Sequence, residues 1–209
     1  MAKIHFKGRI TGVKARIRLL RSFDQVPTHS YLGYCIILSD QFGTESSANT
    51  RTLRIAVGPK THEKNQFRIG DLIEGQGEAV LDRDQEWADL YKISALKVLE
   101  RGSESEVRTA DPDGGIAPPL QEYRERGHFR LQKKTWEEKC QACAYGLMMP
   151  TQIILDHWNP SKQKWRFETH CYGPRDCPRY KAGPPYRVQG RKSFMIYVDD
   201  DVERAELEE

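Results

Sequence analysis

Apolar and polar positions alternate with a period of two along the start of the chain, which is the pattern of half-buried β-strands. The phase of the alternation slips once, and Gly8 and Gly12 flank the slip. A slip of this kind predicts one long strand with a bulge or a sharp bend. The apolar positions before the slip are Ile4, Phe6 and Ile10, and those after it are Val13, Ala15, Ile17 and Leu19.

The rest of the first hundred residues continues in short apolar segments. The segments "SYLGYCIIL", "TLRIAV" and "DLIEGQGEAVL" predict three further strands, and the polar segment "PKTHEKNQFRIGD" predicts one short helical turn. The periodicity of "LYKISALKVLE" fits a helix or a strand. We assign it as a strand because it follows a loop-like segment and because a closed sheet needs a last partner.

Five strands, of which the first is long and bent, with a short helix between the third and the fourth, resemble an OB-fold barrel. The resemblance covers residues 1–101 and rests on the order of the elements. It implies a mainly β protein with an N-terminal five-stranded OB-like barrel. Another small antiparallel barrel or a sandwich is the alternative.

The second half of the chain begins after a segment of linker composition. Residues 102–121 are rich in Ser, Asp, Gly and Pro and predict a flexible linker. In residues 122–198, "TQIILDHW" and "KWRFETH" flank a turn-rich segment and predict a β-hairpin. The sequence therefore predicts a small C-terminal domain built on this hairpin, followed by an acidic tail at 199–209.

Four of the five cysteines flank the predicted hairpin. Cys140 and Cys143 precede it, and Cys171 and Cys177 follow it. Because a hairpin returns the chain to its starting point, we expect the four thiols to meet and to bind one structural Zn²⁺. The arrangement resembles a zinc ribbon or treble clef, although five residues, and not two, separate the second pair.

Other interpretations of the cysteines stay open at this point. Four cysteines also suit an iron–sulfur cluster, but the 27 residues between the two pairs favour zinc. Two unrelated pairs of buried thiols are the plainer alternative. His170, beside Cys171, is expected at the surface at the end of a strand, with a role as substitute ligand as the alternative. Cys35 lies in a predicted strand and is expected in the core.

Charge is distributed unevenly along the chain, although the net charge is only +3. Residues 1–70 hold 12 Lys/Arg against 4 Asp/Glu, residues 71–120 hold 5 against 12, residues 121–198 hold 15 against 7, and the last 11 residues hold 1 against 7. Two basic blocks predict cationic surfaces of the kind that nucleic-acid backbones require. The acidic segment "LDRDQEWAD" predicts a solvated loop, with a site for a hard cation such as Mg²⁺ as the alternative.

Basic and aromatic residues supply candidate contacts to nucleic acid. If the apolar residues of the first strand face the core, the cations between them face outward, and aromatic residues nearby offer stacking platforms for bases. The alternatives are aromatic packing in the core and cations that only cover apolar surface. The candidates are Lys14, Arg16, Arg18, Arg21, Tyr34, Arg54, Trp165, Arg166, Arg175 and Arg179.

Together these patterns predict a non-enzymatic nucleic-acid-binding protein with a structural zinc site. Single-stranded DNA or RNA is favoured because no segment predicts a recognition helix, and no catalytic motif is present. A protein–protein adapter and an iron–sulfur enzyme subunit are the alternatives. The tail at 199–209 resembles the acidic tails of single-stranded-DNA-binding proteins and suggests protein partners. The absence of a signal segment and of a long apolar run predicts a cytoplasmic protein without a membrane partner.

Overall fold

The computed structural model describes residues 2–22, 25–39, 52–102, 115–156, 158–189, 192 and 194–198. The chain is mainly β, as predicted, and forms two compact units. Unit 1 comprises Met1–Arg16 and Leu32–Ala117, and unit 2 comprises Ile17–Tyr31 and Pro118–Glu209. This division differs from the predicted one at 1–101 and 122–198, because residues 17–31 group with the second half. The predicted linker is described only at its two ends, and the acidic tail lies outside the described residues.

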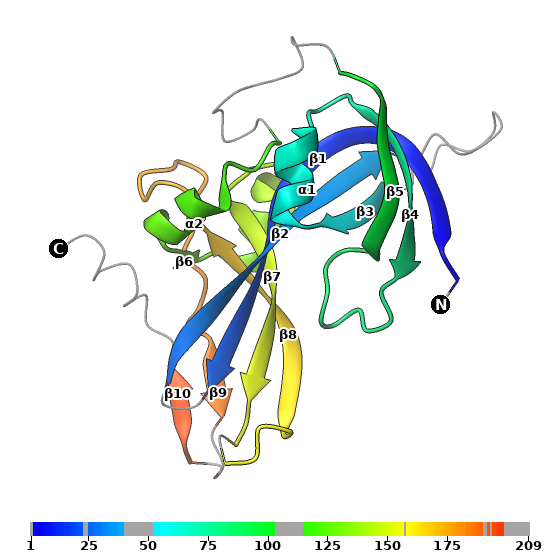
Figure 1. Ribbon diagram of the computed structural model, residues 1–209. Helices are drawn as coiled ribbons and strands as arrows, with labels where there is room; N and C mark the ends of the chain where they lie inside the picture. The colour runs from blue at the N-terminus through cyan, green and yellow to red at the C-terminus, as the bar shows by residue number, and fades with distance from the viewer. Residues whose placement is uncertain are drawn as a thin grey trace. The chain divides into compact units, whose positions relative to one another are not determined.

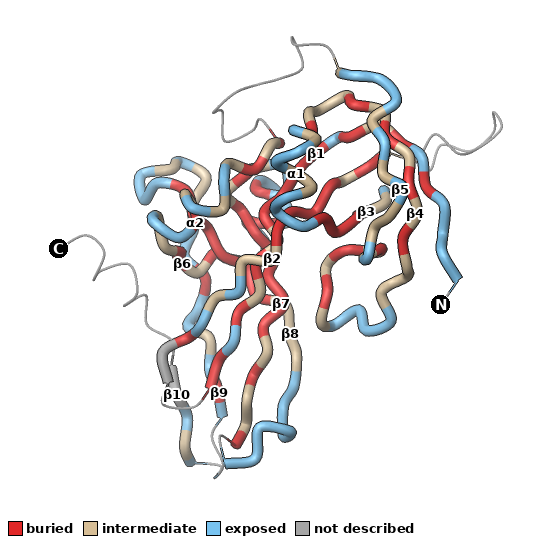
Figure 2. The backbone as a smooth tube through the Cα atoms, viewed as in Figure 1, coloured by how far each residue is buried: buried red, intermediate tan, exposed pale blue. Residues whose placement is uncertain are grey.

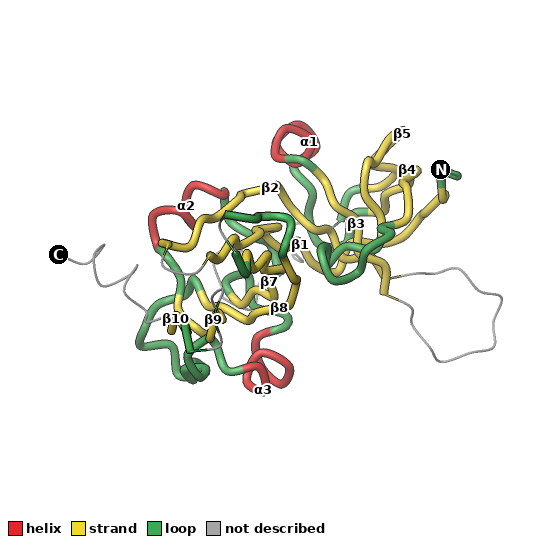
Figure 3. Tube along the Cα trace, turned by 90° about the horizontal axis from the view of Figure 1, so that it is seen from below, coloured by secondary structure: helices red, strands yellow, loops and turns green. Residues whose placement is uncertain are grey.

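Unit 1 is a ring of five strands with a short helix (Figures 1 and 3). The order of strands is β2-β3-β5-β4-β1, and an additional pairing of β2 with β1 closes the ring. β3 and β5 pair in parallel, whereas β4 is antiparallel to both β5 and β1. With the helix between the third and fourth strands, this topology is OB-like and confirms the predicted barrel. The elements are β1 (Ile4–Ser22), β2 (Gln25–Ser39), β3 (Thr52–Val57), α1 (Pro59–Asn65), β4 (Leu72–Ala79) and β5 (Leu90–Glu100).

The alternation predicted for β1 holds at its start and fails in its middle. Phe6, Gly8 and Ile10 are buried, as a single core-facing row requires, but residues 12–15 are all buried. We attribute the difference to residues 115–117, which pair with this part of β1 in addition to the strands of the barrel. The Val13 amide donates to the carbonyl of Gly115 (2.6 Å), and the Ala117 amide donates to the carbonyl of Val13 (2.7 Å).

Unit 2 is built on the predicted hairpin, with β7 and β8 antiparallel and in register from Gly146↔Cys171 to Ile154↔Gln163. Its sheet has the order β1-β7-β8-β6, because Leu19–Ser22 of β1 pair in parallel with Thr151–Ile154 of β7. The second half of the chain therefore borrows a strand from the first. The elements are α2 (Leu120–Arg126), β6 (Phe129–Arg130), α3 (Lys133–Thr135), the π-helical turn η2 (Trp136–Cys140), β7 (Gly146–Ile154), β8 (Gln163–Cys171), β9 (Arg187–Gln189) and β10 (Ile196–Val198).

Burial in unit 2 falls along the hairpin (Figure 2). The start of β7 and the end of β8 are buried, whereas residues 158–164 around the turn are exposed. The cysteines thus lie at the buried end of the hairpin and the basic turn at the exposed end. Within the described part of the chain, no helix is both long and apolar enough to cross a membrane.

Candidate nucleic-acid interface and cysteine cluster

The predicted outward row of cations on β1 is only partly correct in unit 1. Lys14 is 3% exposed, so its assignment to the surface is wrong. Residues 115–117 pair with β1 at the neighbouring Val13. Arg16 is partly exposed, and its Nε donates to the Glu86 carboxylate (2.8 Å).

Arg54 of β3 lies at the surface of the barrel, as predicted, but it is paired. Its Nε and a terminal nitrogen donate to the two carboxylate oxygens of Asp89 (3.1 Å each), and its amide donates to the same side chain (2.8 Å). Arg83 pairs with Asp89 as well. Burial opposes ionisation of Asp89, but the hydrogen bonds from Arg54 and Arg83 outweigh burial and lower its pKa.

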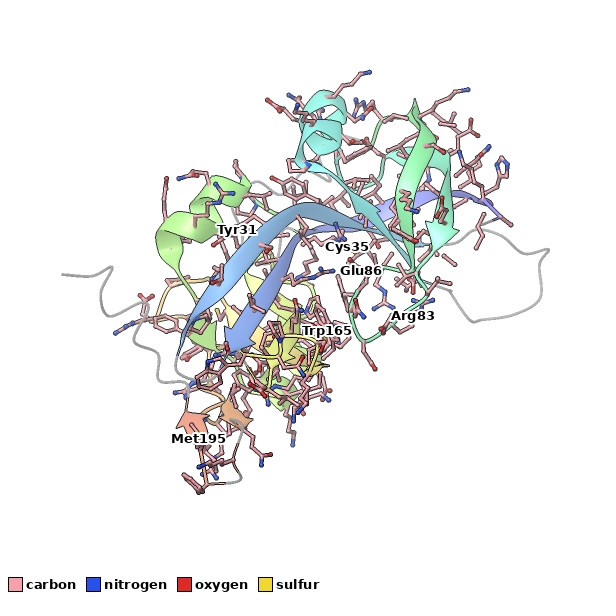
Figure 4. The ribbon with its side chains drawn as sticks, turned by 60° about the horizontal axis from the view of Figure 1, so that its bottom comes forward. Tyr31, Cys35, Arg83, Glu86, Trp165 and Met195 are labelled. Carbon is pink, nitrogen blue, oxygen red and sulfur yellow. The ribbon has the colours of Figure 1, made fainter. Side chains whose placement is uncertain are left out.

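The acidic loop, residues 80–89 between β4 and β5, packs against this face of the barrel. Cys35, Ala56 and Ala88 form a buried cluster, and Trp87 packs against it. Figure 4 labels Arg83 and Glu86 on the acidic loop and Cys35 on β2, and the Glu86 charge is close enough to Cys35 to add to the increase in its pKa that burial causes. The Glu86 carboxylate is buried and also accepts the Ala88 amide (3.2 Å). The acidic loop is therefore not the fully solvated segment that the sequence predicts, whereas Cys35 is in the core, as expected.

Trp87 carries a stacked arginine. The Arg54 guanidinium lies 5.1 Å from the centre of its ring, and the tryptophan is partly exposed. Tyr34, in contrast, is 6% exposed, and its ring packs 4.1 Å from that of His62. The core alternative is therefore correct for Tyr34, and the sequence prediction of a stacking platform there is wrong.

A second arginine–tryptophan stack lies in unit 2. The Arg18 guanidinium lies 5.1 Å from the centre of the Trp165 ring, and both residues are partly exposed. The register places Leu20 opposite Gln152 and Gln152 opposite Trp165. Because directly paired residues share one face of a sheet, Arg18, Leu20, Gln152 and Trp165 lie on the same face of β1, β7 and β8.

The opposite face of this sheet carries a buried charge network. Arg21 is 1% exposed, and its Nε donates to the buried Glu168 carboxylate (2.9 Å). The Arg21 guanidinium also lies 5.5 Å from the centre of the Tyr186 ring. Arg166 donates to the other Glu168 oxygen (2.6 Å) and to the carbonyl of Arg187 (3.1 Å). The prediction of Arg21 as a surface contact is therefore wrong, and Arg166 is committed to Glu168, with its side chain 32% exposed.

Three histidine rings pack in a row beside this network. The His128 ring lies 4.7 Å from the His29 ring and 4.6 Å from the His170 ring. Burial, assisted by Arg21, lowers the pKa of His29 to about 4. Burial also holds the pKa of His170 well below its ordinary value, and the nearby His128 adds to this effect. His170 is fully buried, so the expectation that it lies at the surface is wrong.

The four cysteines that flank the hairpin gather at its buried end. Cys140 and Cys171 share a core cluster with Leu131 and Trp136, and Cys143 packs against that cluster. The Gly173 amide donates to the Cys171 sulfur (3.3 Å). The hairpin thus returns the chain as the sequence predicts.

The thiols also influence one another. Burial raises the pKa of Cys171 to about 11, and Cys143, Cys140 and Cys177 add to the increase, while the hydrogen bond from Gly173 opposes it. The described side chains nevertheless contain no group of three or more His, Cys, Asp or Glu that is arranged as a metal-ligand set. All five cysteines are free thiols.

The remaining two candidates lie in or just after the segment between Cys171 and Cys177. Arg175 is exposed, and its guanidinium lies 4.6 Å from the centre of the Phe129 ring. Arg179 is partly exposed. Both remain at the surface of unit 2, as predicted.

Sequence reasoning missed the carboxylates that bind the candidate arginines. Glu86 and Asp89 appear in the sequence only as members of an acidic loop, and Glu168 appears as one acid in a basic strand. The signal for Glu168 was its place at a core-facing position of β8, since a charge there needs a buried partner.

Comparisons with known proteins add little to this geometry. No protein-family model and no curated protein matches the chain. Among solved structures, the mitochondrial single-stranded DNA-binding protein Rim1 of S. cerevisiae aligns with 49% of this chain and 97% of its own, at 14% identity and a TM-score of 0.30. The OB-like fold of unit 1 rests on its strand order and not on this alignment.

Proposed function

We propose that the protein binds single-stranded nucleic acid. The observation that carries the proposal is an arginine stacked on a partly exposed tryptophan in each unit, Arg54 on Trp87 and Arg18 on Trp165. A guanidinium supplies phosphate contacts, and an aromatic ring supplies a platform for a base, so each pair holds both requirements in one place. The basic blocks of the sequence add the long-range attraction that steers a polyanion toward such sites.

The described elements favour a single strand over a duplex. Within the described residues the longest helices, α1 and α2, have seven residues each. A recognition helix that reads the major groove is an established route to duplex binding, and these short helices do not provide one. Exposed bases, in contrast, stack on partly exposed aromatic rings of a sheet or barrel.

The test is the binding of fluorescently labelled oligothymidylate and oligouridylate by the full chain over a salt series. We expect a complex of micromolar or tighter affinity at low salt that weakens steeply as salt rises. Absence of a complex with either oligonucleotide at low salt would contradict the proposal.

Substitutions at Trp165 test the role of the stack. Trp165→Ala is expected to weaken binding about fivefold to a hundredfold, because base–aromatic stacking contributes about 1–3 kcal/mol per base. Trp158→Ala is the matched control, because Trp158 lies in the exposed turn between β7 and β8 and is 70% exposed. An equal loss in both variants would show that the Arg18–Trp165 pair has no special role.

We also propose that Cys140, Cys143, Cys171 and Cys177 hold one structural Zn²⁺. The proposal is supported by the convergence of the two pairs at one end of the hairpin and by the N–H···S hydrogen bond from Gly173. Four neighbouring thiols, of which those of Cys140 and Cys171 are buried, are a donor set that suits Zn²⁺, which binds them as thiolates. Bound zinc would contribute folding free energy and leave no open coordination position.

Elemental analysis of the purified protein tests this second proposal. We expect about one zinc per chain, lost in Cys143→Ser and retained in Cys35→Ala, because Cys35 lies in the core of unit 1. Removal of the metal with a strong chelator should lower the cooperativity of thermal unfolding followed by circular dichroism. Protein that contains no zinc and is indifferent to the chelator would overturn the proposal.

A further inference from the structure

We propose that the phosphate-binding part of the barrel is the surface that carries Arg16 and Arg54, and that the acidic loop occupies this surface in the free protein as an intramolecular competitor. The inference rests on the proposed binding of single-stranded nucleic acid and names where on unit 1 it occurs. It follows from the contacts of two carboxylates, Glu86 and Asp89.

The carboxylates lie where the phosphates of a bound strand are expected. Glu86 accepts from the Nε of Arg16 (2.8 Å), and Asp89 accepts from the Nε and a terminal nitrogen of Arg54 (3.1 Å each). Carboxylates and phosphates are recognised by the same planar fork of guanidinium donors. A strand that binds Arg16 must therefore replace Glu86 on that side chain.

Trp87 of the acidic loop contacts the second of the two arginines, Arg54. The Arg54 guanidinium lies over the Trp87 ring at 5.1 Å, so a base that stacks on this face of Trp87 takes the place of the guanidinium. Trp87 and Tyr91 also pack over the cluster of Cys35, Ala56 and Ala88. In the free protein the acidic loop thus supplies both an anion and an aromatic ring to the face of the barrel.

The two ends of the acidic loop are fixed, while its tip is exposed. The Val80 amide donates to the Asp89 carbonyl (3.0 Å), and the Asp89 amide donates to the Arg54 carbonyl (2.7 Å). Residues 81–84 are exposed. Glu86 itself is buried. Release of Arg16 and Arg54 therefore breaks the side-chain contacts of Glu86 and Asp89, while the backbone hydrogen bonds at Val80 and Asp89 hold the two ends of the loop.

Such a competitor lowers the apparent affinity by the fraction of molecules in which the loop is displaced. Glu86→Gln tests this directly, because the amide keeps an oxygen that accepts the Ala88 amide but loses the charge that attracts Arg16. We expect this variant to bind oligothymidylate about threefold more tightly or better at low salt, the range in which a single ion pair acts.

Glu100→Gln is the matched control. Glu100 pairs with Arg9 (2.8 Å), which lies on β1 as Arg16 does, and the substitution changes the net charge by the same amount. We expect Glu100→Gln to change the affinity less than twofold. Equal gains in both variants would assign the effect to net charge alone and overturn the competitor.

A second pair of variants separates the competitor from general loosening of the fold. Arg16→Gln should weaken binding, and in that background Glu86→Gln should have no effect, because the shared partner is gone. A gain from Glu86→Gln that persists without Arg16 would contradict the inference. Unfolding midpoints of all variants show whether the affinities refer to folded protein.

Amide hydrogen exchange supplies an independent outcome. On addition of oligothymidylate we expect faster exchange in residues 81–88 and unchanged or slower exchange in β3, since the strand displaces the tip of the loop. Slower exchange in the loop would show that the loop closes over the oligonucleotide, and would contradict the proposal that the loop competes with it. If neither the wild type nor Glu86→Gln binds any oligonucleotide, the proposed function fails. If both bind equally, only the competitor fails.

Discussion

Arg21 illustrates at the level of one residue why alternation alone did not identify the surface. The sequence places it just beyond a row of cations on β1, and its nearest carboxylate partner, Glu168, lies 147 residues away. A charged side chain enters the interior only when a partner is placed there to receive it. Periodicity carries no record of such distant partners, and the prediction therefore failed at Arg21.

Arg21→Met is expected to destabilise the protein by about 3–5 kcal/mol, because it leaves the Glu168 charge buried with one partner fewer. Urea unfolding followed by circular dichroism measures this change. Arg18→Met is the control on the opposite face of the same strand and should cost about 1 kcal/mol or less. Equal effects of the two substitutions would show that the buried pair is not a special source of stability.

His29 predicts a dependence of stability on pH. Its pKa is lowered from the ordinary 6.5 to about 4 in the folded protein, so the unfolded chain binds a proton more readily than the folded one. The contribution of neutral His29 to the free energy of unfolding is complete above pH 6.5. It is lost as the pH falls toward 4, and the loss is about 3 kcal/mol at most.

Chemical unfolding between pH 7.5 and pH 4 checks the His29 prediction. The variant His29→Gln should show a smaller loss of stability on acidification than the wild type, whereas His5→Gln, at an exposed position of β1, should not. Identical pH profiles for the wild type and His29→Gln would refute the assignment.

At the level of elements, the strands were predictable because their signal is local. The period of two located β1, and apolar segments bounded by turn signals located β2 to β4 and the β7–β8 hairpin. The polar segment after β3 located α1, whereas β5 was assigned from the need of a closed sheet for a last strand. The pairing of residues 115–117 with β1 was not predictable, because these residues come from a segment of linker composition.

A substitution at Gly115 tests how much the pairing of residues 115–117 with β1 stabilises the protein. Its φ of 67° lies in the left-handed region, where a side chain is strained. Gly115→Ala should lower the free energy of unfolding by about 1 kcal/mol. Gly58→Ala is the control, since a Cβ there meets nothing within 4 Å and its φ is −74°. Similar destabilisation by both changes, measured by urea unfolding, would exclude a special role for Gly115.

At the level of the whole molecule, composition and spacing predicted a group of cysteines and two basic regions, but not how the two units share strands. The sequence could predict that the two cysteine pairs lie close together, because they stand at the two ends of one local hairpin. The sharing of β1 and β2 between the two units has no signature in the sequence, because a long strand looks the same whether it pairs within one unit or two. The two units therefore divide the chain differently from the predicted domains at 1–101 and 122–198.

This sharing makes the folding of unit 2 depend on the start of the chain. Leu19–Ser22 supply a strand that pairs with β7, and Arg21 neutralises the buried Glu168. Tyr31 adds a ring 4.6 Å below the guanidinium of Arg124. A fragment of residues 118–209 lacks all three contributions, and we expect it to show no cooperative thermal unfolding and to be digested rapidly by protease.

A fragment of the barrel provides the comparison. Residues 1–16 joined by a short glycine-containing turn to residues 32–117 retain the closed ring of five strands and should unfold cooperatively. Addition of a synthetic peptide of residues 17–31 to the 118–209 fragment should increase its protection from protease, since the peptide restores the missing strand. A cooperatively folded 118–209 fragment without the peptide would show that the borrowed strand is dispensable, and that Glu168 finds enough compensation in Arg166 alone.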